Sequence, residues 1–331
     1  MTDTVAFDQQ NNRLVIIDQT LLPGELRLLS LHTVEEIEHA IKTLQVRGAP
    51  AIGVAAAIGL AVLAKEIAGN YEQTLQAYAQ QLKSTRPTAV NLAWAIDRLL
   101  AGAHDPQSLA EKALALWNED VATCRAIGEN GAALLRAGDA ILTHCNAGRL
   151  AAVRYGTALA PVYVAKEQGK HVQVYADETR PLLQGARLTA FELAEAGVPV
   201  TLLCDNMAAA LLQSGRVNAV FTGADRIARS GDCANKIGSL GLSILSKHFG
   251  VPFYVCAPFS TVDGGCATGE NIPIEQREAA EVTALWYRQP MAPAGVGVFN
   301  PAFDVVPACN ITGIVTERGI FAPTELPIDA K

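Results

Sequence analysis

The sequence of 331 residues lacks the common short motifs of cofactor and hydrolase sites. It contains no GxGxxG, no GxxxxGK[ST], no HExxH and no GxSxG. These absences argue against a dinucleotide site, a P-loop, a zinc protease and a serine hydrolase.

Aromatic residues and clustered positive charges are also scarce. Only 6% of the residues are aromatic, the net charge is -7, and there is no block of Lys and Arg. The chain therefore has no electrostatic footprint for nucleic acid or for an anionic membrane, and we expect neither as a partner. An anionic substrate would need a local basic site.

The seven cysteines form no CxxC pair and follow no regular spacing. This argues against a disulfide framework and a structural zinc site, so we expect a reducing, cytoplasmic compartment and no metal. The N-terminal segment has no apolar signal core, and the most apolar stretch, 49–64, is short for a membrane span and rich in Ala and Gly. We interpret that stretch as a buried helix.

The length and the apolar content, which is half of the residues, predict two domains. We place them at 1–120 and 121–331. In the first, short apolar runs at 15–18 and 26–30 predict an antiparallel ribbon, and Thr33 with Glu36 predicts a capping box that starts a series of helices.

In the second part, short β-branched runs alternate with helical patterns. This alternation predicts an α/β fold with a doubly wound parallel sheet. The expected strands are 140–143, 172–176, 198–203, 219–222 and 253–257, and the expected helices include 188–196 and 242–248.

Polar residues gather directly after several of these strands, where open parallel sheets bind their ligands. Cys145 lies between His144 and Asn146, and these polar neighbours favour a functional thiol over an inert buried one. Because neighbours on a strand point to opposite faces, His144 need not pair with the thiol, and we expect it to be packed and hydrogen-bonded.

Two aspartates follow strands in the same way. Asp225 either places a functional carboxylate at the edge of the sheet or serves only as a helix N-cap. For Asp177 we favour a cap or an ion pair with Arg180.

Phosphate binding draws on Arg, Lys and the backbone N–H groups of Gly-containing helix starts. Two segments fit this description: 47–50, which opens the apolar helix, and 235–238, which precedes another helix. Arg86 is a third candidate cation, or else an ordinary surface residue.

Several long motifs occur in order along nearly the whole chain. They are VRGAPAIG (46–53), RPTAVNL (86–92), THCNAG (143–148), DETRPLLQGARLTAFEL (177–193), TGADRI (222–227), NKIG (235–238) and IPIEQRE (272–278). Together these motifs resemble the S-methyl-5-thioribose-1-phosphate isomerase family of methionine salvage. Regulatory subunits of a translation initiation exchange factor and ribose-1,5-bisphosphate isomerases are similar in fold to that family.

The resemblance implies a small, mostly helical N-terminal domain, a Rossmann-like C-terminal domain, and a homodimer that uses no cofactor and acts on a sugar 1-phosphate. It implies Cys145 and Asp225 as the catalytic pair. The substrate-binding residues that it implies are Arg47, Gly48, Ala49, Arg86, Gln184, Asn235 and Lys236.

In an aldose 1-phosphate the anomeric oxygen is esterified, so the ring C–O bond itself must break. Asp225 would then act as a general acid, which requires a raised pKa such as burial provides, and Cys145 would remove the C2 proton or stabilise charge. Both a cis-phosphoenolate and a C2-to-C1 hydride shift remain open.

Arg149 departs from the family pattern just beyond the cysteine, and this leaves the substituent at C5 of the sugar open. A 5-deoxyribose 1-phosphate isomerase and a ribose-1,5-bisphosphate isomerase are therefore alternatives. From a different class, a non-catalytic nucleotide-sensing subunit would need neither the thiol nor the acid. Thiol-based acyl transfer lacks a convincing base for Cys145.

Overall fold

A computed structural model describes residues 2–86, 90–102 and 105–328. The chain divides into two compact units. The first comprises residues 1–125 and 148–156, and the second comprises residues 126–147 and 157–331. The chain thus leaves the second unit directly after Ala147 and returns to it at Thr157.

A three-stranded antiparallel sheet opens the first unit, with the order β1-β2-β3. The predicted ribbon is confirmed as its second and third strands, with slightly shifted bounds, whereas the first strand was not predicted. The strands are β1 (Val5–Asp8), β2 (Arg13–Ile17) and β3 (Leu28–Leu31).

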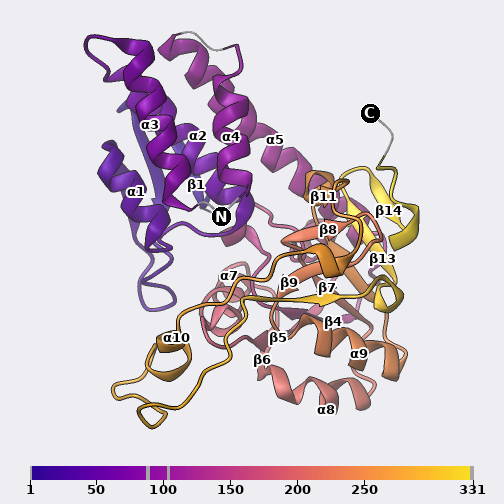
Figure 1. Cartoon of the computed structure of the whole chain (residues 1–331). Helices are drawn as coiled ribbons and strands as arrows, with labels where there is room; N and C mark the ends of the chain where they lie inside the picture. The colour runs from indigo at the N-terminus through magenta and orange to yellow at the C-terminus, as the bar shows by residue number, and fades with distance from the viewer. Residues whose placement is uncertain (1, 87–89, 103–104, 329–331) are drawn as a thin grey trace. The chain divides into compact units, whose positions relative to one another are not determined.

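Helices α1 to α4 and most of α5 follow in this unit, as far as its residues are described (Figure 1). The predicted capping box is confirmed, because the Thr33 side chain accepts from the Glu36 backbone and the Glu36 side chain accepts from the Thr33 backbone. The predicted buried helix is confirmed too, since every residue of 51–64 is buried in the core of the unit. The helices are α1 (Val34–Lys42), α2 (Ala49–Lys65), α3 (Tyr71–Thr85), α4 (Val90–Leu100) and α5 (Pro106–Ala132).

The second unit is built on a seven-stranded sheet with the order β14-β13-β10-β7-β4-β5-β6. All neighbours are parallel except β13 and β14, so the predicted α/β fold with a doubly wound sheet is confirmed. The strands are β4 (Ala140–His144), β5 (Gln173–Glu178), β6 (Val200–Cys204), β7 (Ala219–Thr222), β10 (Phe253–Cys256), β13 (Gly313–Thr316) and β14 (Gly319–Phe321).

Helices α8 and α9 contact each other and lie on one side of this sheet (Figure 1). The predicted helix 188–196 begins instead as a π-helical turn, η2 (Gly185–Thr189), and continues as α7. The helices are α6 (Ala160–Glu167), α7 (Ala190–Glu195), α8 (Ala208–Gln213), α9 (Ser239–Phe249) and α10 (Ala279–Thr283).

A second, four-stranded sheet with the order β11-β8-β9-β12 was not predicted from the sequence. Its strands are only two to four residues long, too short to show a period-2 pattern. They are β8 (Arg226–Ala228), β9 (Cys233–Lys236), β11 (Val262–Asp263) and β12 (Phe303–Val306).

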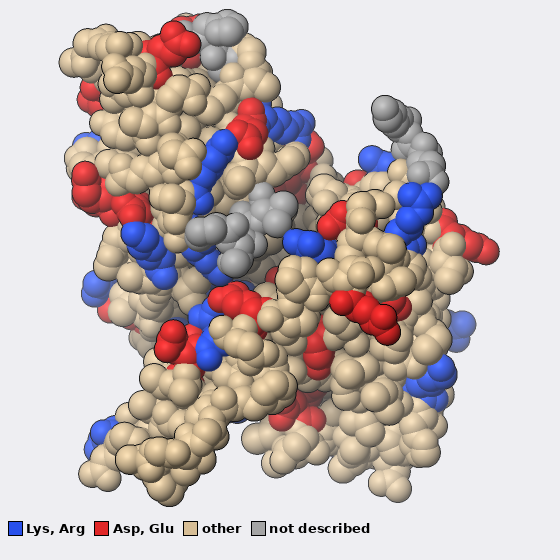
Figure 2. All heavy atoms as spheres, viewed as in Figure 1, with Lys and Arg blue, Asp and Glu red and all other residues tan. Residues whose placement is uncertain are grey.

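Acidic and basic side chains alternate over the face of the molecule that Figure 2 shows. This face therefore carries a mixed charge rather than a field of one sign. Within the described residues, no helix is both long and apolar enough to cross a bilayer.

Candidate functional site

The centre of the large sheet is the point where its strand order reverses. From β4 the chain builds outward through β5 and β6, and it then returns to the other side of β4 to add β7 and β10. Such a switch point is where open α/β sheets bind ligands, at the carboxyl ends of the strands. Cys145 follows β4, and Asp225 follows β7 after two residues. Both strands are fully buried, as predicted.

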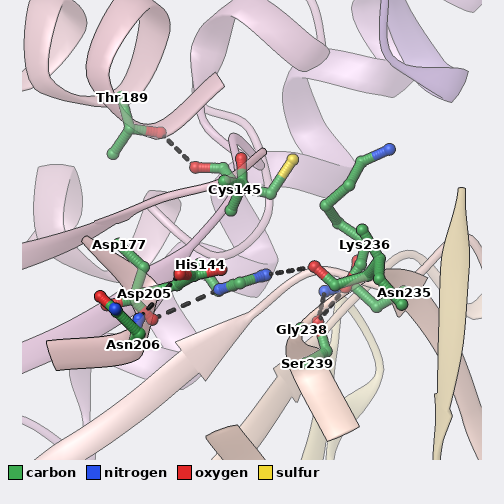
Figure 3. A network of polar contacts seen from close by, with 12 residues as sticks. His144, Cys145, Asp177, Thr189, Asp205, Asn206, Asn235, Lys236, Gly238 and Ser239 are labelled. Carbon is green, nitrogen blue, oxygen red and sulfur yellow. Dashed lines mark hydrogen bonds and ion pairs between the residues drawn. The ribbon is translucent and has the colours of Figure 1, made fainter. Parts of the chain in front are cut away.

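Cys145 has a left-handed backbone, with φ at 62°. Such a conformation costs a residue with a Cβ about 1–2 kcal/mol. The residue is 8% exposed, and its backbone carbonyl oxygen accepts a hydrogen bond of 2.6 Å from Thr189 Oγ1. In Figure 3 the thiol points away from the buried ring of His144. Strained residues of this kind cluster at functional sites.

A buried polar cluster supports this strained residue. Asn146 donates from Nδ2 to Thr189 Oγ1 at 3.1 Å and also to Glu192 Oε1. Glu192 is fully buried and accepts from the Tyr163 hydroxyl at 2.9 Å. Thr189, Glu192 and Tyr163 were not predicted from the sequence. The one sequence signal is a Glu, at 192, in a buried position of an otherwise apolar helix face.

Asp225 lies at the start of the hairpin formed by β8 and β9, and its N–H donates to the Ala234 carbonyl at 2.8 Å. Gly223, two residues earlier, approaches Ala147 so closely that an added Cβ would lie 2.8 Å from the Ala147 Cβ and 4.0 Å from Asn235 Oδ1. The loop after Cys145, the turn before Asp225 and Asn235 therefore meet at Gly223. The Asp225 side chain is exposed, so the burial that we expected for a general acid is absent in this conformation.

Asn235 and Lys236 form the end of β9. Asn235 is buried, and its Nδ2 donates to Ser239 Oγ at 2.8 Å, while Ser239 Oγ donates to the Lys236 carbonyl. The Lys236 ammonium donates to the Ala302 carbonyl at 3.2 Å and lies 4.9 Å from the centre of the Phe303 ring. This segment was predicted as a helix start, and it does precede α9.

Gln184 is buried at the start of η2, and its Oε1 accepts from Thr179 Oγ1 at 3.2 Å. A Cβ on the next residue, Gly185, would lie 1.9 Å from the Asp177 carbonyl oxygen, so only glycine fits there. Because η2 also carries Thr189, it links Gln184 to the Cys145 backbone.

His144 is packed and hydrogen-bonded, as predicted. Its Nδ1 lies 3.3 Å from Asp177 Oδ2, and its Nε2 lies 2.8 Å from the Ile237 carbonyl oxygen. The preferred interpretation of Asp177 as a cap or a partner of Arg180 was wrong. Asp177 contacts His144 because the neighbouring strand places the two residues in register. Arg180 instead donates to the Val282 carbonyl and stacks on Tyr287.

In the first unit, Arg47, Gly48 and Ala49 lie at the start of α2, with Gly48 as its N-cap. Gly48 has φ at 90°, and a Cβ there would lie 2.3 Å from the Ala151 carbonyl oxygen. The start of α2 thus packs on the segment that follows Cys145 in the chain. Arg86 is the C-cap of α3, and residues 87–89 of the RPTAVNL motif lie outside the described residues.

Arg149 is fully buried within the first unit. Its Nη1 donates to the Thr2 carbonyl at 3.0 Å, and its own carbonyl accepts from Thr4 Oγ1 at 2.8 Å. These contacts give Arg149 a part in holding the N-terminal segment. Across 2–86, 90–102 and 105–328, no cluster of His, Cys, Asp and Glu has the arrangement of a metal site.

Comparisons with known proteins agree with this architecture. Residues 45–323 match the Initiation factor 2 subunit family. A methylthioribose-1-phosphate isomerase of Symbiobacterium thermophilum is 54% identical, covering 97% of this chain and 93% of its own. A 5-deoxyribose 1-phosphate isomerase of Moorella thermoacetica is also 54% identical, covering 95% of this chain and 93% of its own.

Among solved structures, a 5-methylthioribose 1-phosphate isomerase from Pyrococcus horikoshii OT3 superposes with a TM-score of 0.93 at 40% identity, covering 99% of this chain and 94% of that one. The chain therefore belongs to the Initiation factor 2 subunit family and, within it, to the sugar 1-phosphate isomerases that these relatives represent.

Proposed function

We propose that the protein converts S-methyl-5-thio-α-D-ribose 1-phosphate to S-methyl-5-thio-D-ribulose 1-phosphate in methionine salvage. One observation carries the proposal. A thiol and a carboxylate follow the two central strands at the switch point, in a chain that is 54% identical over nearly its whole length to a methylthioribose-1-phosphate isomerase.

Asp225 is the proposed general acid. It donates a proton to the ring oxygen as the bond from that oxygen to C1 breaks, and it regains a proton from the 2-hydroxyl as C2 becomes a carbonyl. Its exposed side chain can reach a ligand, but the acid must be protonated when it acts. We therefore propose that bound substrate supplies the desolvation that this conformation lacks.

Cys145 is the proposed partner at C2. In a phosphoenolate route its sulfur removes the C2 proton, which is later returned to C1. In a hydride route the hydrogen moves from C2 to C1 directly, and the cysteine stabilises the developing charge. Either route gives the ketose 1-phosphate, and the left-handed backbone of Cys145 fixes where its sulfur is presented.

Substrate binding is proposed for one group of residues in each unit. In the first unit, Arg47 and Arg86 supply positive charge, and the free N–H groups at Gly48 and Ala49 suit a phosphate at the start of a 17-residue helix. The residues proposed in the second unit are Gln184, Asn235 and Lys236.

The substrate is tested by comparing kcat/KM for the 1-phosphates of methylthioribose, 5-deoxyribose and ribose 5-phosphate. We expect methylthioribose 1-phosphate to be preferred by about 10-fold or more over the deoxy compound, which is what burial of one apolar substituent can provide. A preference for the bisphosphate would contradict the proposal.

A 5-deoxyribose 1-phosphate isomerase is the second candidate, because a relative with that name is equally similar. Arg149 was the reason for doubting the C5 substituent. Its side chain contacts the N-terminal segment, which gives no support to a role in recognising C5.

A non-catalytic, nucleotide-sensing subunit remains the alternative from another class. The strained Cys145 and its buried support count against it, because nucleotide sensing has no need for a thiol held at this cost. If the pure protein turns over none of the three 1-phosphates but binds a nucleotide, that alternative replaces our proposal.

We further propose a cytoplasmic homodimer. All seven cysteines are free, which suits a reducing compartment. Strand β6 is an edge strand with exposed apolar residues, including Leu202 (46%) and nearby Met207 (53%), and a second copy would cover such an edge. Sedimentation analysis should give a dimer that Leu202→Glu dissociates. A wild-type monomer at micromolar concentration would contradict the homodimer.

A further inference from the structure

A single peptide group, the one that joins Ile237 to Gly238, is held from both sides by buried or half-buried side chains. His144 Nε2 lies 2.8 Å from the Ile237 carbonyl oxygen, and the Gly238 N–H donates to Asp304 Oδ2 at 2.7 Å. Asp304 also accepts from the Leu240 N–H at 3.0 Å, so it caps α9 from another strand. This peptide directly follows Asn235 and Lys236 in the chain.

The two ring nitrogens of His144 both face acceptors. The Ile237 carbonyl can only accept, so Nε2 must carry a hydrogen. On the other side of the ring, Nδ1 faces Asp177 Oδ2 at 3.3 Å. A further proton must therefore lie between Nδ1 and Oδ2, since otherwise a lone pair would face a carboxylate. The ring is an imidazolium when that proton belongs to Nδ1.

The charges around the ring favour the imidazolium. Carboxylates from three different elements act on it: Asp177 on β5, Asp205 on η3 (Asp205–Met207) and Asp304 on β12. The nearby cation in the sequence, Lys236, directs its ammonium to the Ala302 carbonyl and the Phe303 ring instead. Burial lowers the pKa of His144, but the hydrogen bond and charge of Asp177, the hydrogen bond to the Ile237 carbonyl and the charge of Asp205 outweigh burial, so the net shift is upward. Burial also raises the pKa of Asp177.

The fold also makes room for this ring. Gly238 has φ at 104°, and a Cβ there would lie 2.7 Å from His144 Cε1. Figure 3 shows the ring lying between Asp177 and the turn at Gly238, while the side chains of Cys145 and Lys236 point away from it. The ring therefore joins two backbone segments without occupying the side on which the thiol is presented.

We propose that His144 is a positioning residue that remains an imidazolium across the working pH range and fastens the segment carrying Asn235 and Lys236 to the strand end carrying Cys145. The kinetic part of this inference depends on the proposed isomerase function, whereas the charge state of the ring does not. His144 itself touches no substrate in this account. It acts through the peptide that joins Ile237 to Gly238.

The charge state is tested on the wild-type protein by nitrogen NMR with 15N-labelled histidine. His144→Gln assigns the signals, and exposed His171 serves as an internal control. We expect both His144 nitrogens to remain protonated from pH 6 to 8. A His144 that is a neutral Nε2–H tautomer at pH 7 would overturn the proposal, because the bridging proton would then belong to Asp177.

The positioning role is tested with His144→Gln, Asp304→Asn and the double variant, with His171→Gln as the matched control. We expect His144→Gln to lower kcat/KM by about 10²-fold, mainly through KM, because small displacements of binding groups cost about that much. The double variant should lose less than the product of the two single effects, since both residues hold one peptide.

A merely structural histidine would behave differently. His144→Gln would then lower the melting temperature and the fraction of active enzyme while KM stayed at the wild-type value, and that result would overturn the positioning role. Titration of the same variants with inorganic phosphate separates this outcome from failure of the proposed function. If the wild type turns over no sugar 1-phosphate, phosphate affinity should still fall about 10-fold in His144→Gln, and an unchanged affinity would overturn the inference.

Discussion

The start of helix α2 and the end of strand β4 both need a left-handed backbone, and they meet the need with different residues. At the helix start the residue is Gly48, with φ at 90°, and the absence of a side chain lets the Ala151 carbonyl approach. At the strand end the residue is Cys145, with φ at 62°, which carries a side chain in a conformation that disfavours one.

The difference shows where the molecule accepts strain. Gly48 is required both by its positive φ and by the close Ala151 carbonyl, so no side chain fits there. Cys145 accepts a hydrogen bond from Thr189, and Thr189 in turn accepts one from Asn146, which also donates to the buried Glu192. This support makes sense if the thiol itself is needed. Four predictions test this comparison.

The largest effect is expected at Gly48. Gly48→Ala adds a Cβ that would lie 2.3 Å from the Ala151 carbonyl, so the helix start or the following segment must move. We expect the free energy of unfolding to fall by at least about 3 kcal/mol, measured by urea denaturation. Gly69→Ala is the matched control, because Gly69 has φ at 97° but nothing within 4 Å, and it should cost only about 1 kcal/mol. Equal losses of unfolding free energy in the two variants would mean that the close approach of the Ala151 carbonyl to Gly48 is unimportant.

A smaller effect is expected at Thr189. Thr189→Val keeps the shape but removes the hydroxyl that donates to the Cys145 carbonyl at 2.6 Å, leaving a buried acceptor without this partner. We expect a loss of about 1–3 kcal/mol in unfolding free energy, together with a fall in kcat. Exposed Thr201→Val is the control. Wild-type kcat in Thr189→Val would show that the cluster does not support the cysteine.

A pH-dependent effect is expected at Asp120, which holds the segment after Cys145 by accepting from the Val153 N–H at 2.8 Å. Burial raises the pKa of Asp120 from 3.8 to about 6. A carboxyl with a raised pKa stabilises the fold fully below its unfolded pKa, and this contribution is lost as the pH rises through the folded value.

Asp120→Asn should therefore match the wild type near pH 4 and become more stable than it by about 2–3 kcal/mol at pH 7, measured by thermal unfolding at each pH. Glu111→Gln, at an exposed carboxylate of the same helix, controls for general charge removal. A constant difference between Asp120→Asn and the wild type over this range would contradict the raised pKa.

The smallest effect on the free energy of unfolding is expected at Cys145 itself. Cys145→Gly relieves the left-handed strain, whereas Cys145→Ala keeps it, and both lose the thiol. We expect the glycine variant to be more stable than the alanine variant by about 1 kcal/mol in urea denaturation. If alanine were the more stable residue, the backbone at this position would not be strained.

The sequence predicted a helix or strand correctly where its sequence pattern was long or depended only on local contacts. The 51–64 run is long and uniformly apolar, so its burial in α2 was predictable, and the Thr33–Glu36 capping box rests on local bonds alone. Strands β8, β9, β11 and β12 have four residues or fewer, and their pairing depends on partners distant in sequence. Such strands give no periodic signal.

The same reasoning applies to the candidate site. Cys145 and Asp225 were predicted because both follow buried strands, and that placement is a property of the local sequence. The partners of His144 were not predictable, because Asp177 meets it through strand register and Ile237 follows a strand of the second sheet. Asp177 was predicted to be a cap or to pair with Arg180, because the sequence shows only near neighbours.

The central claim is that Cys145 and Asp225, presented at the switch point, carry out the isomerisation. The most direct measurement is the turnover of S-methyl-5-thioribose 1-phosphate by Cys145→Ser and Asp225→Asn, compared with Cys309→Ser, which alters an exposed cysteine. We predict that kcat falls by about 10²–10⁴-fold in the first two variants, while the fold is kept and Cys309→Ser matches the wild type. A rate close to wild type in either Cys145→Ser or Asp225→Asn would contradict the account.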